Sequence, residues 1–143
     1  MQDDRLRSSL GHAVVRLFRL VNRATNRALK DRELSAEQAH ILLALWIEGP
    51  KPMGALQKLL ALSSPTLTGA IDRMETQALV RRVPSTEDRR VSVIEPRVPP
   101  RKRSEIEALI VESDRASFAM LTAAERKELL RLLDKCIAGL DAE

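Results

Sequence analysis

The sequence predicts a mainly α-helical fold that contains one small β-hairpin, and three observations lead to this prediction. Apolar residues recur three and four positions apart through most of the chain, which is the period of an amphipathic helix. Capping motifs stand at the predicted helix starts. Two short β-prone runs, separated by turn-forming residues, follow the third of the central helices. With 143 residues, of which 44% are hydrophobic, the chain has the size of one domain with a real core.

The N-terminal part of the chain is expected to form three helices. The first runs from Leu6 to Leu29, because its apolar residues lie three or four positions apart. The second begins at the capping box Ser35–Gln38 and is stopped by Gly49-Pro50, with Lys51-Pro52 extending the break. A short helix then spans roughly Met53 to Leu60.

The next helix is followed by a hairpin. Ser63 is a good N-cap, and Pro65 is tolerated in a first turn, where backbone N–H groups have no intrahelical partner. This helix is expected to end near Gln77. Two β-prone runs follow, Leu79–Val83 and Val91–Ile94, and the residues between them include turn formers. The pair therefore predicts a hairpin with a loose tip.

Two more helices complete the expected fold. Three prolines, at positions 96, 99 and 100, end the second strand and lead into the first of them. Ser104–Glu107 is a capping box for that helix, and Thr122–Glu125 is one for the last helix. The first and last helices of the chain are long and strongly apolar on one face. The simplest cover for those faces is a second copy of the chain.

The net charge of +4 conceals an alternating pattern. Residues 1–32 and residues 81–103 each carry eight basic and three acidic side chains, which is a net charge of +5 for each block. Residues 33–80 and residues 104–143 have net charges of −2 and −4. The second positive block therefore indicates an anionic partner more strongly than the total charge or the pI near 9.7.

Composition argues against several other classes of protein. Aromatic residues make up 2% of the chain, which argues against single-strand binding by base stacking. One cysteine, Cys136, excludes an intrachain disulfide, and with His12 and His40 as the only histidines we expect no metal and no cofactor. No apolar run reaches the roughly 20 residues that span a bilayer. The polar N-terminus lacks a signal-peptide core, so a cytoplasmic protein without membrane contact is expected. No nucleophile–base pair or phosphate loop is present, so no catalytic residues and no enzyme are expected.

Three helices followed by a β-hairpin is the order of a winged helix-turn-helix domain. The N-terminal end of the third helix of such a domain reaches base edges in the major groove of duplex DNA. An arginine at a hairpin tip suits the narrow minor groove, and Asp88, two residues from Arg90, can orient that arginine. The predicted DNA-contacting residues are Ser63, Ser64, Pro65, Thr66, Thr68, Arg73, Arg89 and Arg90.

Residues 34–94 resemble the MarR family of bacterial winged-helix regulators of antibiotic resistance, stress and catabolic genes. The ordered motifs that carry the resemblance are Leu34-Ser-Ala-Glu-Gln-Ala, Leu62-Ser-Ser-Pro-Thr-Leu-Thr68, Ile71-Asp-Arg-Met-Glu75, Leu79-Val-Arg81 and Glu87-Asp-Arg-Arg90. The resemblance implies an obligate homodimer with interlocked terminal helices, which binds a pseudo-palindromic operator, here as a repressor. It also implies that Arg90 enters the minor groove and that Asp88 braces it.

The expected organisation has three parts. Residues 1–34 form an N-terminal dimerisation helix, and residues 98–143 form C-terminal dimerisation helices. Residues 35–97 form the DNA-binding lobe, with a recognition helix at about 63–77 and a wing at about 79–95. Many members of the family bind a small aromatic or lipophilic acid between the dimer helices and the lobe. Such an effector pocket would be lined here by His12, Arg16, His40 and Trp46.

The sequence departs from the family at two places. Ala78 stands where the family usually has glycine before Leu-Val, and a left-handed alanine costs roughly 1 kcal/mol more than glycine. The C-terminal end of the recognition helix can therefore differ in geometry from that of other family members. The segment Glu95–Arg101 stands where the family has Leu-Thr-x-x-Gly, which bears on the angle between the wing and the helix after it.

Alternatives to an operator-specific regulator stay open. One is a sequence-tolerant architectural DNA-binding protein, and another is a degenerate winged-helix domain that acts as a protein-interaction adaptor. A hydrolase that its motifs do not reveal is the least favoured.

Two further expectations concern the terminal helices. Arginines of the first helix are hypothesised to pair with acidic residues of the partner's penultimate helix in a dimer. The residues concerned are Arg16, Arg19, Arg23 and Arg27 on one side and Glu105, Glu107, Glu112 and Asp114 on the other. Cys136 is expected to be a buried, inert thiol.

Overall fold

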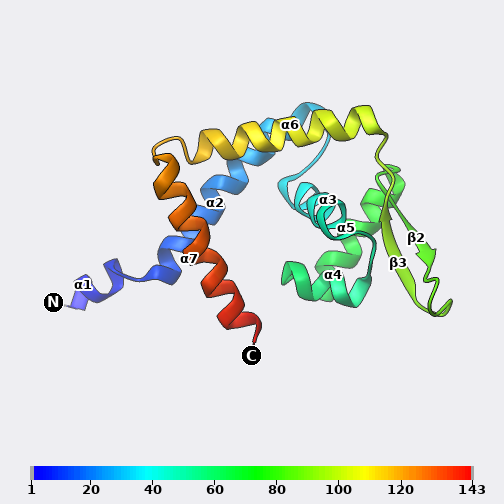
Figure 1. Ribbon diagram of the computed structural model, residues 1–143, viewed down its shortest axis with the longest axis horizontal. Coiled ribbons are helices and arrows are strands. Elements are labelled where there is room, and N and C mark those ends of the chain that lie inside the picture. Colours follow the sequence, from blue (N-terminus) through cyan, green and yellow to red (C-terminus); the bar gives the residue numbers. More distant parts are fainter. Residues whose placement is uncertain (1, 143) are drawn as a thin grey trace.

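The chain forms a helical arm and a separate lobe, and within the arm α2 packs against α6 (Figure 1). The computed structural model describes residues 2–142. Helices α1, α2, α6 and α7 form an extended arm, and α3, α4 and α5 form a separate lobe with the small sheet. In chain order the elements are α1 (Gln2–Arg7), α2 (Leu10–Leu29), the 3-10 helix η1 (Lys30–Arg32), α3 (Ala36–Glu48), β1 (Lys51–Pro52), α4 (Met53–Leu60), α5 (Ser64–Thr76), β2 (Val80–Pro84), β3 (Ser92–Pro96), α6 (Pro100–Ser117) and α7 (Ala123–Asp141). The predicted fold class, mainly helical with a small β-structure, is confirmed.

The hydrophobic core lies in the lobe. Leu56 of α4, Ile71 of α5 and Ile94 of β3 are fully buried in one cluster, and burying a side chain of this size contributes roughly 1.5–3 kcal/mol. Leu29 at the end of α2 and Ile106 in α6 are buried in the same cluster. The arm is therefore anchored to the lobe by the same core that holds α5.

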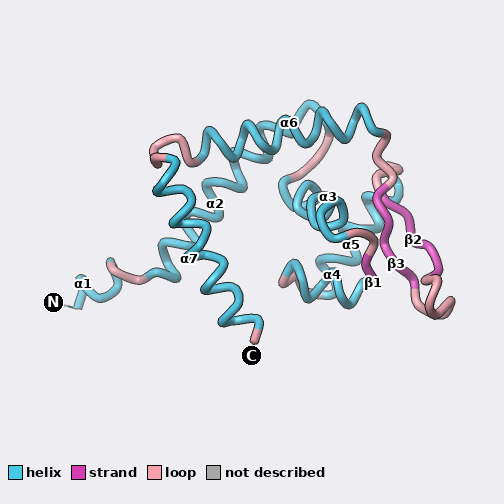
Figure 2. Tube along the Cα trace, in the orientation of Figure 1, coloured by secondary structure: helices cyan, strands magenta, loops and turns pink. Residues whose placement is uncertain are grey.

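The predicted hairpin forms part of a three-stranded antiparallel sheet with the strand order β1-β3-β2 (Figure 2). All five residues of β2 pair with the five residues of β3. The sequence predicts only a break at Lys51-Pro52, and the structure corrects this prediction. Lys51 pairs with Ile94, and Pro52 pairs with Val93. A two-residue strand has no periodicity of its own, and it becomes a strand only because the free edge of β3 lies beside it.

Three predicted caps are confirmed. Ser35 and Gln38 form a reciprocal capping box at the start of α3, and Thr122 and Glu125 form another at the start of α7. The side chain of Ser63 accepts a hydrogen bond from the backbone N–H of the third residue of α5. The side chains thus satisfy backbone donors that the first turn of each helix leaves free.

Two predicted helix starts are wrong. The first helix is interrupted, because the side chain of Ser9 accepts from the backbone N–H of His12 and caps α2, while the Ser8 hydroxyl donates to the carbonyl of Arg5. Serine side chains compete with backbone groups in this way. Ser104 does not cap α6, which begins at Pro100, since proline at a first helical position has the required φ and no N–H to satisfy.

Three residues other than glycine adopt a left-handed conformation among the described residues: Glu33, Ala61 and Ala78, with φ of 56°, 52° and 57°. After α5, the backbone N–H of Leu79 donates to the carbonyl of Met74 at 2.9 Å, and that of Ala78 donates to the carbonyl of Glu75 at 3.0 Å. These bonds form a Schellman motif. Ala78 therefore adopts the backbone conformation that glycine favours, at a cost of roughly 1 kcal/mol.

The arm leaves apolar side chains exposed in the single chain. Leu10 in α2 is 81% exposed and Leu140 in α7 is 72% exposed, and no residue of α7 is buried. Cys136 on α7 is exposed, which corrects the expectation of a buried thiol for the single chain. Among the described residues, no helix is long and apolar enough to cross a membrane.

Candidate nucleic-acid interface

The first turn of α5 presents exposed hydroxyl groups. Ser63 accepts from the backbone N–H of Thr66 at 3.3 Å, and its hydroxyl donates to Thr66 Oγ1 at 2.7 Å. Leu67, on the inner face, is buried. The exposed residues of this turn are Ser63, Ser64, Pro65, Thr66 and Thr68. A helix N-terminus with exposed hydroxyls can bind phosphate oxygens and donate to base edges.

Arg73 adds a positive charge to the same helix. A methyl group at Gly69 would lie 3.5 Å from Arg73 Nη1, so the guanidinium folds back over Gly69 toward the N-terminal turn. Arg73 is exposed, and within residues 2–142 it has no ion-pair partner. Its charge is therefore free for a phosphate group.

The tip of the wing holds an arginine in place with a carboxylate. Asp88 Oδ1 accepts from the backbone N–H of Arg90 at 3.0 Å and from Nε at 3.1 Å, and Oδ2 accepts from Nη2 at 3.2 Å. The side chain and then the backbone N–H of Arg90 lower the pKa of Asp88, so this carboxylate is ionised at neutral pH. Arg90 has a side chain that is 91% exposed, and Arg89 beside it is also exposed. The tip therefore projects an oriented cation into solvent.

Two arginines of the positive block 81–103 are neutralised within the fold. Arg81 pairs with Glu95 across β2 and β3 at 2.9 Å. Arg82 pairs with Asp72 of α5 at 2.8 Å and also with Glu75 of α5. The interpretation that this positive block indicates an anionic partner is thus corrected for these two residues, whose charges hold the wing together and link it to α5.

Two further cations of that block lie at the other end of α5. Arg97 and Lys102 line a groove with Gln77 and Ala78, which follow the C-terminal end of the helix. Arg103 donates to Glu107 at 2.7 Å. The structure therefore separates these basic side chains from the hydroxyl-rich first turn.

The four residues expected to line an effector pocket lie apart in the single chain. His12 and Arg16 line a groove together with residues of the α1–α2 junction. Trp46 packs under Arg103, whose guanidinium carbon lies 4.9 Å from the ring centre, and His40 is exposed on α3. The single chain therefore does not bring these four residues into one pocket.

The hypothesis of arginine–carboxylate pairs between subunits gains no support. Three of the four acidic residues already have partners in their own chain. Glu105 pairs with Arg32 at 3.4 Å, and Glu107 and Glu112 pair with arginines of α6 itself. In the single chain these three carboxylates therefore already have partners, whereas Asp114 has no ion pair among the described residues.

A helix-turn-helix followed by a hairpin with an exposed, carboxylate-held arginine defines a winged-helix DNA-binding domain, and comparisons with known proteins agree with this class. The sequence pattern of the MarR family matches residues 34–92. Over 138 residues, the chain is 32% identical to the HTH-type transcriptional regulator MgrA of Staphylococcus aureus, covering 95% of this chain and 92% of that protein. The protein belongs to the MarR family and is a DNA-binding transcriptional regulator.

Two solved structures share the fold over nearly their whole length. One is a mutant MarR from E. coli complexed with operator DNA, with 22% identity, a TM-score of 0.74 and coverage of 89% of this chain and 92% of that one. The other is BpsR from Bordetella bronchiseptica, whose DNA binding is regulated by 6-hydroxynicotinic acid, with 24% identity and a TM-score of 0.75. It covers 90% of this chain and 93% of that one.

Sequence reasoning missed the role of Arg82 as an anchor of the wing. Its partners Asp72 and Glu75 lie ten and seven positions earlier, which is no spacing of a regular element. A basic residue in a strand that directly follows a helix with two acidic residues on one face was the available signal.

Proposed function

We propose that the protein is a homodimeric repressor that binds a pseudo-palindromic operator and is released from it by a small-molecule effector. The observation that carries the proposal is the wing tip, where Asp88 accepts three hydrogen bonds from Arg90, two of them from its exposed side chain. Binding duplex DNA, without catalysis, is the activity that this geometry supports, and the cytoplasm is the compartment where we expect it.

The proposed contacts divide between the two grooves. The exposed hydroxyls of the first turn of α5 reach base edges and phosphates in the major groove, with Arg73 on the backbone. Arg90, with Arg89 beside it, enters the minor groove, where negative potential attracts arginine. A cation held in one orientation loses less conformational entropy on binding than a free one.

The proposed homodimer rests on the uncovered apolar faces of the arm. Leu10 and Leu17 of α2 and Ile137 and Leu140 of α7 are all large exposed hydrophobic residues. Exposed apolar surface of this kind typically marks an interface, and a second copy with two-fold symmetry would cover both chains at once. Two lobes related by this symmetry would bind two DNA half-sites about 34–36 Å apart.

Effector control is proposed by analogy with BpsR, whose DNA binding is regulated by 6-hydroxynicotinic acid. A ligand releases DNA only if it binds more tightly to a dimer whose lobe spacing does not match the half-sites. The connection between arm and lobe is the place where such a ligand would act, because α2 and α6 there share the core of the lobe.

The test is fluorescence anisotropy with a duplex from the region upstream of the protein's own coding sequence and with a scrambled duplex, at two salt concentrations. An operator-specific regulator binds the first duplex at least about 10³-fold more tightly. Equal affinity with a strong salt dependence would identify an architectural DNA-binding protein instead. Dimerisation without binding to any duplex would identify an adaptor.

A further inference from the structure

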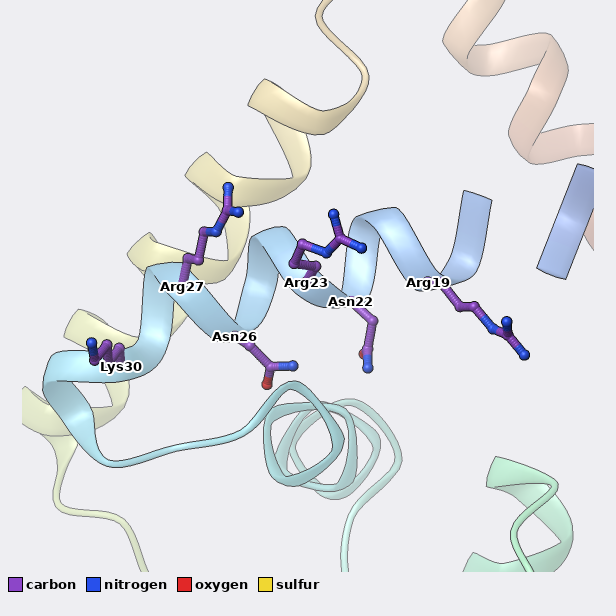
Figure 3. Close-up of a pocket in the computed structure, with 6 residues that line it drawn as sticks. All are labelled: Arg19, Asn22, Arg23, Asn26, Arg27 and Lys30. Atoms are coloured by element: carbon purple, nitrogen blue, oxygen red, sulfur yellow. The ribbon is translucent and has the colours of Figure 1, made fainter. Parts of the chain in front are cut away.

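The polar side of α2 carries a row of cations without partners. Arg19, Arg23, Arg27 and Lys30 line one shallow groove together with Asn22 and Asn26 (Figure 3). The groove has a volume of about 510 Å³. Helix α2 contains no acidic residue, and among the described residues none of these cations has a carboxylate within 4.0 Å. We call this set the α2 cationic groove.

The arrangement is unfavourable for the chain on its own. Arg19, Arg23 and Arg27 follow one another at four-residue intervals, which places like charges on adjacent turns of one face. Like-charge pairs at this spacing destabilise a helix, and no carboxylate of α2 offsets them. A bound anion would remove this repulsion.

The protein itself offers few carboxylates for this purpose. On α6, Glu105, Glu107 and Glu112 are all engaged in ion pairs within their own chain. On α7, Glu128 pairs with Arg131, and Glu125 completes the capping box. Among the described residues, Asp114 of α6 and Asp134 and Asp141 of α7 have no ion pair, but they are isolated single charges, whereas an anion from outside the protein brings several charges to the groove at once.

The donors of the groove favour phosphate. Three of its four cations are arginines, whose planar forks bind phosphate oxygens in pairs. The α-carbons of Arg19 and Lys30 lie about 16 Å apart along the helix at 1.5 Å per residue, which suits a linear ligand with several charges. Figure 3 shows Asn22 and Asn26 pointing toward α3 while Arg23 and Arg27 extend away from it.

We propose that the α2 cationic groove binds a multivalent phosphate anion, of the class in which several phosphates form one chain. Asn26 lies within this groove and connects it to the lobe, because Asn26 Oδ1 accepts from the backbone N–H of Ala36 at the start of α3 at 2.6 Å. The proposal does not depend on the proposed operator binding, and its test contains no DNA.

The test is isothermal titration calorimetry of the full chain with inorganic tripolyphosphate at physiological salt. The triple variant Arg19→Gln, Arg23→Gln, Arg27→Gln is expected to bind about tenfold more weakly or worse, since charge-assisted bonds are lost. The matched control is Arg126→Gln, Lys127→Gln, Lys135→Gln on α7, which removes the same charge from exposed residues and is expected to keep the affinity. Arg23→Gln alone is expected to show an intermediate loss and provides the test if the triple variant does not fold.

Four results would overturn the proposal. Absence of binding to the unaltered protein is the first, and equal losses in the two triple variants, which would show a diffuse charge effect, are the second. The third is a triple variant that becomes monomeric by light scattering, because the groove would then be a contact between copies. An acidic peptide of equal charge that binds as tightly as tripolyphosphate would overturn the assignment to phosphate.

Discussion

Arg82 of β2 lies 2.8 Å from Asp72 of α5, and the same guanidinium pairs with Glu75 on the next turn of that helix. This contact links the wing directly to α5. It therefore holds strand β2 of the wing against that helix. It also offsets part of the negative charge of two carboxylates on the helix that we propose approaches phosphate groups.

Replacing Arg82 by alanine is expected to weaken operator binding and to lower the free energy of unfolding by about 1 kcal/mol, a small value because the pair is partly exposed. Urea unfolding and DNA anisotropy measure the two effects. Arg81→Ala is the matched control, because it removes the same charge and breaks only the pair with Glu95 inside the wing. Equal losses of DNA affinity in the two variants would show that charge alone matters.

Arg90→Ala is expected to weaken specific DNA binding by roughly 1–3 kcal/mol and to leave the dimer intact. Anisotropy measures the affinity, and light scattering measures the mass. Arg115→Ala removes another exposed, paired arginine from α6 and should leave DNA binding unchanged. If the Arg90 variant bound DNA as tightly as the unaltered protein, the wing tip would not be part of the DNA interface.

Asp88→Ala separates orientation from charge. The variant is more positive, so simple electrostatics predicts tighter binding to DNA, whereas loss of the three hydrogen bonds to Arg90 predicts weaker specific binding. We expect the weaker binding, measured by anisotropy against the operator duplex. Tighter binding to the operator would contradict the bracing role.

The same carboxylate sets a pH expectation. Because Arg90 lowers the pKa of Asp88, the bracing contribution is fully present above the pKa of the unfolded chain. It is lost only as the pH falls through the still lower pKa of the folded protein. The difference in DNA affinity between the unaltered protein and Asp88→Ala should therefore be the same at pH 7 and about pH 5.5.

Ala78→Gly is expected to stabilise the protein by up to roughly 1 kcal/mol, because glycine adopts the left-handed conformation at the end of α5 without a Cβ clash. Ala61→Gly, after α4, should act in the same direction for the same reason. Ala108→Gly, inside α6, is the control and should destabilise by roughly 0.5–1 kcal/mol. Urea midpoints compare the three, and destabilisation by Ala78→Gly would contradict the strain argument.

Charges on the apolar face of the arm should break the dimer. Leu10→Asp and Ile137→Asp each place a carboxylate where we propose that a second copy packs, and light scattering should report a monomer. Ile47→Asp is the control, since this 78% exposed residue of α3 lies in the lobe. A dimer that survives both arm substitutions would place the interface elsewhere.

Local chemistry is what the sequence alone determined. Ser35, Ser63 and Thr122 cap helices because a side-chain oxygen and a backbone N–H three residues later suffice to form the bond. The hairpin and the order of elements followed from residue period and turn formers, which also depend on near neighbours. The separation of Asp88 and Arg90 is likewise short enough to read from the sequence.

Tertiary structure decided what depends on distant partners. Lys51-Pro52 became a strand only beside β3, and Arg82 became an anchor only when β2 came to lie against α5. Ala78 kept a left-handed conformation against its intrinsic preference, because Leu79 after it is buried in the core. The structure also divided the positive block 81–103 into paired structural cations and free ones. Whether a cation is paired or free depends on which carboxylate the fold brings within reach of it. A net charge counted along the chain carries no information about these distances.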